Sequence, residues 1–222
     1  MATHLDLEEQ EQLDRLKHFW NLYGNLITGV VILAAVAVLG WNGWHYWQQR
    51  QSTQAAALYD ELDRAVQAGD PAKVQRAFDD MTSRFGSTVY AQQAGLLTSK
   101  TLADKGQADA SRAALTWVAD KGTDPGYRAV ARLRLAAALL ETKAYDEALK
   151  QLDGSFPEEF KGLVADRRGD VLLAQGKRNE AQAEYKKAWT ALAQDAAYRK
   201  LVEVKLNAVG VDPASLSAQA SS

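Results

Sequence analysis

The hydrophobic pattern divides the chain into two unlike parts. Residues 18–49 contain no Asp, Glu, Lys or Arg, and within them residues 22–44 form an almost continuous apolar run. Beyond residue 50, apolar residues recur at helical spacing between charged ones, and the alternation typical of strands is absent. This pattern predicts an all-α protein, with one long apolar helix near the N-terminus and a helical domain after it.

The apolar run is long enough to cross a membrane. Its 23 residues would extend about 35 Å as a helix, against a hydrocarbon core of about 30 Å. The run ends in Trp-rich sequence and not at a small-residue cleavage site, which predicts a retained signal anchor at 22–44 in a lipid bilayer. Aromatic residues cluster at both ends, as is typical at headgroup depth, namely Phe19, Trp20 and Tyr23 at its start and Trp41, Trp44, Tyr46 and Trp47 at its end.

Charges beside the run bear on its orientation. Arg15 and Lys17 precede it and Arg50 follows it, a basic bias that places the acidic segment 1–21 in the cytoplasm. On charge alone the reversed topology stays open.

Small residues recur every three positions inside the run, at Ala34, Ala37, Gly40 and Gly43. Such a strip lets a second membrane helix approach closely, so these four residues are candidates for helix packing in the membrane. The alternative is that small residues are simply common in spanning helices.

Turn signals recur along the second part of the chain, at Gly69, Gly106, Lys143 and Gly176. Their steps of 37, 37 and 33 residues bracket the period of about 34 of a tetratricopeptide helical hairpin. We therefore predict a right-handed superhelix of about four hairpins over residues 50–209, with a C-terminal capping helix and a disordered tail at 210–222. The predicted helices are 52–68, 72–84, 88–104, 108–120, 127–142, 146–153, 159–175, 179–193 and 196–209.

The fourth unit carries the clearest repeat motif. Gly169 stands where the first helix needs a small residue, and Ala181, Tyr185 and Ala188 follow at the small-aromatic-small spacing of the second helix. Small residues at helix crossings allow neighbouring hairpins to bury their apolar faces against each other.

Composition excludes several kinds of chemistry. The chain has no cysteine, and its three histidines, His4, His18 and His45, all precede the predicted domain. No glycine-rich phosphate loop occurs, and a net charge of −2 gives no footprint for nucleic acid. We therefore expect no enzyme activity, no cofactor, no metal and no nucleic-acid partner; an enzyme or a nucleotide-driven transporter accessory is the least supported alternative.

The remaining candidate is a protein-binding groove on the first helices of the hairpins. Equivalent positions in the units predict a mostly apolar lining, with charges at its margins. The alternative is that the alignment of the units is wrong by one residue, in which case the residues assigned to the groove would belong to the core. The predicted groove residues are Tyr59, Leu96, Lys100, Val130, Leu133, Ala137, Leu140, Leu163, Asp166, Asp170 and Leu173.

Several strings, together with this architecture, resemble a known family. They are Glu9 to Trp20 before the span, Arg132 to Leu140, Ala165 to Gly176, and Lys205 to Asn207. The chain resembles the YfgM-type ancillary subunits of the bacterial Sec translocon over about residues 6–209.

The resemblance implies a non-enzymatic inner-membrane protein with a cytoplasmic N-terminus and a periplasmic repeat domain. It implies the SecYEG translocon and a membrane-anchored periplasmic chaperone of the PpiD type as partners, and unfolded secretory proteins as clients. The alternative is a membrane-anchored tetratricopeptide scaffold for another complex, with reversed topology.

Overall fold

The computed structural model describes residues 7–214 and 216, and every regular element among them is a helix. The chain divides into two compact units, residues 1–51 and 52–222, which we describe separately. The elements are α1 (Leu7–Gln67), α2 (Pro71–Phe85), α3 (Val89–Asp104), α4 (Ala108–Lys121), α5 (Pro125–Glu141), α6 (Tyr145–Leu152), a 3-10 turn η1 (Glu158–Phe160), α7 (Lys161–Ala174), α8 (Arg178–Ala191) and α9 (Arg199–Ala208).

Helix α1 is longer than the sequence pattern predicts. The pattern indicates a span at 22–44 and a separate helix from 52, whereas α1 runs without interruption from Leu7 to Gln67. The reason is that residues 44–68 contain neither Pro nor Gly, so nothing there ends a helix.

The apolar part of α1 has no protein core around it. By length and composition α1 could cross a membrane, and only 6% of its most apolar 18-residue window is buried. Leu33 and Leu39 are 72% and 71% exposed. So much apolar surface is unfavourable in water and is stable in hydrocarbon.

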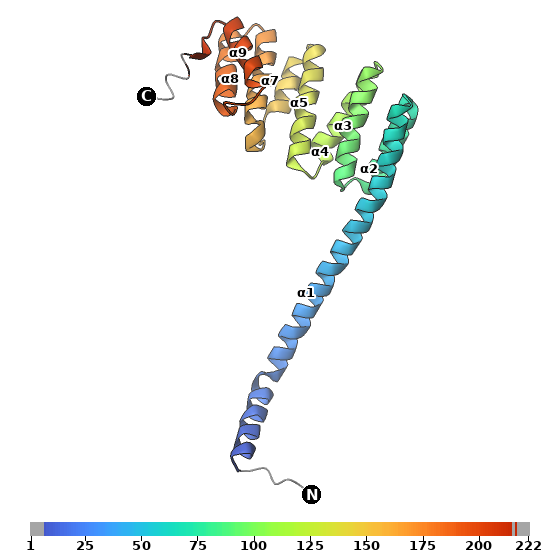
Figure 1. The fold of residues 1–222 in the computed structure, drawn as a ribbon, viewed down its shortest axis with the longest axis vertical. Helices are drawn as coiled ribbons and strands as arrows, with labels where there is room; N and C mark the ends of the chain where they lie inside the picture. Colours follow the sequence, from blue (N-terminus) through green and yellow to red (C-terminus); the bar gives the residue numbers. More distant parts are fainter. Residues whose placement is uncertain (1–6, 215, 217–222) are drawn as a thin grey trace. The chain divides into compact units, whose positions relative to one another are not determined.

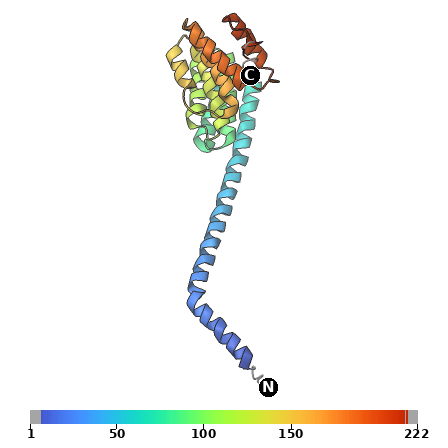
Figure 2. The same ribbon diagram turned by 90° about the vertical axis from the view of Figure 1, so that its left-hand side faces the viewer.

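In the second unit, helices pair into antiparallel hairpins that follow one another in chain order (Figure 1). Figure 2 shows the same stack turned by 90°, with successive hairpins one behind another. Aspartates begin two of the helices: the Asp70 and Asp124 carboxylates accept backbone N–H bonds of α2 and α5, each with a proline at the first helical position. The all-α, tetratricopeptide-like fold is confirmed.

The predicted turns share one geometry. Gly69, Gly106, Lys143 and Gly176 all have a positive φ, and Lys143, at φ 60°, is the single non-glycine with a positive φ among the described residues. At each turn two backbone hydrogen bonds cap the C-terminal end of the preceding helix. At Gly106, for example, Gln107 N donates to Leu102 O and Gly106 N donates to Ala103 O. The sequence equivalence of Lys143 with the glycines is thus confirmed.

The repeat also sets the core. Counted from the four turn residues, the same position in the second helix of each hairpin is occupied by Val74, Ser111, Ala148 and Ala181, and all four are buried. The position four residues later is occupied by Phe78, Leu115, Leu152 and Tyr185, which are buried as well. Neighbouring hairpins therefore bury one shared set of side chains, as a stack of repeats requires.

The turn geometry occurs a fifth time, at Gly210, 34 residues after Gly176. Beyond it the Asp212 carboxylate accepts the Ala214 N–H at 2.9 Å, and Val211 and Leu216 pack on the last core cluster. The domain thus continues beyond the predicted end at 209, at least to Ala214. Residues 215 and 217–222 of the predicted disordered tail lie outside the described residues.

Candidate partner-binding surface

The predicted groove residues of the first two units lie on α1 and α3. Tyr59 and Leu96 are half-buried and pack against the core clusters. Burial, and then the neighbouring charge of Asp63, raise the pKa of Tyr59. Lys100 is exposed and forms an ion pair with Asp104 at 2.7 Å. Tyr59 and Leu96 therefore lie at the edge of the core, and Lys100 lies on the surface beside them.

The four groove residues on α5 share one face of that helix, and all are half-buried: Val130, Leu133, Ala137 and Leu140. Leu133 and Leu140 pack against the central core cluster, as does Leu96 of α3. Arg134 of α5 donates from Nη1 to the Leu96 carbonyl at 3.3 Å, so α3 and α5 lie side by side here. The structure therefore brings the apolar positions of these two helices together.

On α7 the prediction is partly wrong. Leu163 is half-buried and Leu173 is 39% exposed, as a binding surface requires. Asp166, however, is fully buried, and Asp170 is mostly buried. Both are covered by α9 and by Tyr185 of α8, so they do not line an open groove. We call the remaining apolar set the first-helix face: Leu96, Val130, Leu133, Ala137, Leu140, Leu163 and Leu173.

The two aspartates hold helix α9 in place. Lys205 Nζ lies 2.7 Å from Asp166 Oδ2 and 2.7 Å from Asp170 Oδ1. Tyr198 Oη donates to Asp166 Oδ2 at 2.6 Å, and Tyr185 Oη donates to Asp170 Oδ1 at 2.9 Å. The network therefore joins α7, α8 and α9 through charge-assisted hydrogen bonds.

Sequence reasoning missed this network because Lys205 is separated from the aspartates by more than thirty residues. One signal was present: two aspartates one helical turn apart occupied positions that are apolar in the third unit. A carboxylate on an apolar face is rarely buried without a partner.

The network makes the domain sensitive to alkaline pH. Burial raises the pKa of Tyr185 and of Tyr198, and the carboxylates of Asp170 and Asp166 raise them further. Below pH about 10 both the folded and the unfolded chain hold these protons, so stability there does not depend on them. Above pH about 10 only the unfolded chain releases them, so the free energy of unfolding should fall as pH rises.

We expect Tyr185→Phe combined with Tyr198→Phe to flatten that fall. The measurement is the urea midpoint of the full chain in detergent between pH about 9 and about 11.5. Tyr145→Phe on α6 is the control and should keep the slope of the parent. A double variant that loses stability with pH as steeply as the parent would contradict this explanation.

The candidate packing strip in the membrane lies on α1. Ala34, Ala37, Gly40 and Gly43 are all exposed, and a Cβ added at either glycine would meet nothing within 4 Å. The strip thus leaves room for another helix, and membrane-helix packing stays a prediction. Among the described residues, no group of three or more His, Cys, Asp or Glu side chains could hold a metal ion.

Comparison with known proteins shows the class of protein to which this chain belongs. The family model of the tetratricopeptide repeat-like domain matches residues 17–211, which include the apolar part of α1 as well as the hairpins. Three relatives are each named an ancillary SecYEG translocon subunit. The protein of Neisseria gonorrhoeae is 32% identical over 210 residues, 94% of this chain and all of that protein.

The proteins of Escherichia coli and Haemophilus influenzae are each 28% identical. The matches cover 91% and 90% of this chain and 97% of each relative. The chain belongs to the family of ancillary SecYEG translocon subunits.

Proposed function

We propose that this chain is a non-enzymatic subunit associated with the SecYEG translocon, anchored by α1 with its N-terminus in the cytoplasm and its helical domain in the periplasm. The names of the relatives support the association. The apolar segment of α1 supports the anchor, and Arg15 and Lys17 before it support the orientation.

The domain, in this proposal, binds a membrane-anchored chaperone of the PpiD type and assists the folding of proteins that leave the channel. The observation that carries this role is the first-helix face, where half-buried apolar side chains of α3 and α5 pack on one core cluster, and Leu163 and Leu173 of α7 occupy the equivalent positions of the next hairpin. Such a face suits an apolar segment or the apolar side of a helix. Partners anchored in one membrane have a high effective concentration, so individually weak contacts suffice.

Protease treatment of intact spheroplasts tests the orientation. A periplasmic domain should be digested while a cytoplasmic marker protein remains intact. Protection of the domain until the membrane is lysed would overturn the orientation and would favour a scaffold that faces the cytoplasm.

A single charge on the first-helix face should weaken binding. Leu173 is exposed enough to be replaced without loss of the core, and Leu173→Glu would place a carboxylate in an apolar contact. We expect at least about a tenfold higher Kd for the periplasmic part of a PpiD-type chaperone. Ala113→Glu, which adds the same charge to the exposed side of α4, should change the Kd less than about twofold.

Salt separates apolar from charged binding in the same titration, carried out with the full chain in nanodiscs. Apolar contacts are little screened, whereas the Debye length falls to about 3 Å in 1 M salt. Binding by the parent should therefore persist at 1 M salt. Loss of parent binding in salt, or an unchanged Kd for Leu173→Glu, would show that the partner binds elsewhere.

A further inference from the structure

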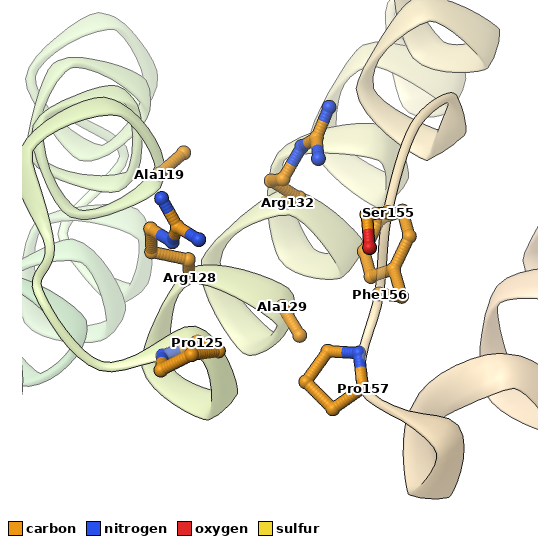
Figure 3. A pocket seen from close by; sticks show the side chains of 8 residues that line it. All are labelled: Ala119, Pro125, Arg128, Ala129, Arg132, Ser155, Phe156 and Pro157. Atoms are coloured by element: carbon orange, nitrogen blue, oxygen red, sulfur yellow. The ribbon is translucent and has the colours of Figure 1, made fainter.

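A second surface, away from the first-helix face, has the chemistry of a binding site. It is a pocket of about 460 Å³ over the N-terminal half of α5 (Figure 3). Ala119 of α4 borders one side, and the loop residues Ser155, Phe156 and Pro157 border the other. Arg128 and Arg132 of α5 lie between these two borders.

The pocket exists because α6 is short. Helices α4 and α8, at equivalent places in their hairpins, have 14 residues each, whereas α6 has 8. Where a longer helix would cover α5, the chain leaves the helix after Leu152 and turns at Gly154, which has φ 99°. This loop is fixed to α5, because Arg132 Nη2 donates to the Asp153 carbonyl at 2.8 Å and the guanidinium lies 4.9 Å from the Phe156 ring.

Positive charge in this pocket is not neutralised by the protein. No carboxylate of a described residue forms an ion pair with Arg128 or Arg132. The nearest acidic side chain along the chain, Asp124, is engaged by the backbone N–H groups of Gly126 and Tyr127 at 2.8 and 3.0 Å.

The neighbouring pocket, on the other side of the same loop, is different. Its basic residues all have acidic partners: Lys161 pairs with Glu158, Arg168 with Asp153 and Lys187 with Glu184. Each basic side chain of this second pocket therefore has an acidic partner, whereas Arg128 and Arg132 of the first pocket have none among the described residues.

We propose that this pocket binds an acidic segment of a partner protein in extended conformation, with carboxylate side chains at alternate positions and an apolar residue between them. Guanidinium groups bind carboxylates through paired N–H bonds. Arg128 and Arg132 are one helical turn apart, about 6 Å along α5, and side chains at i and i+2 of an extended chain are about 6.6 Å apart. The residue between them points to the opposite side of the extended segment, away from the two guanidinium groups.

The geometry selects side-chain carboxylates over a free C-terminus, because a chain end supplies one carboxylate for two guanidiniums. The site goes beyond the proposed role of the first-helix face, since Arg128 and Arg132 occupy another side of α5 than Leu133 and Ala137. The two surfaces therefore can be tested by different variants.

The test uses the full chain in nanodiscs of neutral lipid and fluorescent peptides with blocked ends. A peptide with a central Glu-Phe-Glu should bind at least about tenfold more tightly than its Gln-Phe-Gln counterpart, and its affinity should fall with rising salt. Arg128→Gln should weaken binding of the Glu peptide about tenfold. Arg128 is the residue to change because it is exposed, whereas Arg132 also holds the loop.

Arg134→Gln is the matched control, since it removes the same charge from α5 at an exposed residue that does not line the pocket. It should change the affinity less than about twofold. Equal binding of the Glu and Gln peptides, or full binding by Arg128→Gln, would overturn the proposal. So would loss of binding by Arg134→Gln alone, tighter binding of an acid-free peptide with a free C-terminus, or displacement of the Glu peptide by phosphatidylglycerol vesicles.

Discussion

Lys205→Met should be among the most destabilising single changes in the helical domain. It leaves the fully buried Asp166 and the mostly buried Asp170 without their shared cation. Removal of one partner from a buried ion pair costs about 3–5 kcal/mol, and we expect about 3 kcal/mol because the Lys205 side chain is 20% exposed. In a domain of this size, the Tm should fall by about 6–12 °C.

Hydrogen exchange would locate the loss, since α9 should exchange faster while α2 to α5 change little. The matched control is Lys200→Met, an exposed lysine on the same helix, which should stay within about 0.5 kcal/mol of the parent. If Lys205→Met proves as stable as Lys200→Met, the network does not hold α9.

A double variant isolates the interaction itself. Asp166→Asn and Lys205→Met together should cost less than the sum of the two single changes, by at least about 1 kcal/mol. The reason is that Lys205→Met harms the domain mainly by leaving a buried charge, and Asp166→Asn removes one of the two charges. Additive costs would mean that the two residues stabilise the domain independently.

The repeat architecture could be predicted because its determinants are local. A left-handed turn residue, a small residue at a crossing and an apolar period each lie within one hairpin. The spacing of the other turns is enough to predict a turn at Lys143. A non-glycine residue is unusual there, because its φ is 60°. Predicted helix boundaries from 72 onward mostly lie within two residues of the observed ones for the same reason.

The site was harder to predict because burial on a repeat depends on the next repeat. Asp166 and Leu173 occupy one helix face, and only the position of α9 makes the first buried and leaves the second exposed. The pocket at Arg128 shows the same dependence. The early end of α6 was readable from the sequence, but the absence of acidic partners for the arginines follows from the packing of α4, α5 and the 153–157 loop.

The crossing of α7 and α8 has no room for a side chain at Gly169. A Cβ built there would lie 2.6 Å from Cδ1 of Tyr185 and closer still to Cε1. Tyr185 is buried and held by Asp170, so its ring has no free space to enter. Gly169→Ala should therefore lower the free energy of unfolding by about 2–3 kcal/mol through overpacking, despite the better helix propensity of alanine.

The third unit supplies the compensating change. There the positions equivalent to Gly169 and Tyr185 are occupied by Ala136 and Leu152, both buried in one core cluster. Gly169→Ala combined with Tyr185→Leu places the same pair of residues in the fourth unit. The loss of unfolding free energy in the double variant should therefore be smaller than the sum of the two single losses, by at least about 1 kcal/mol. The measurement is urea unfolding, in detergent, of the parent, the two single variants and the double variant, which together form a double-mutant cycle. If Gly169→Ala is neutral, or if the double variant shows no such recovery, the contact between Gly169 and Tyr185 is not what limits this position.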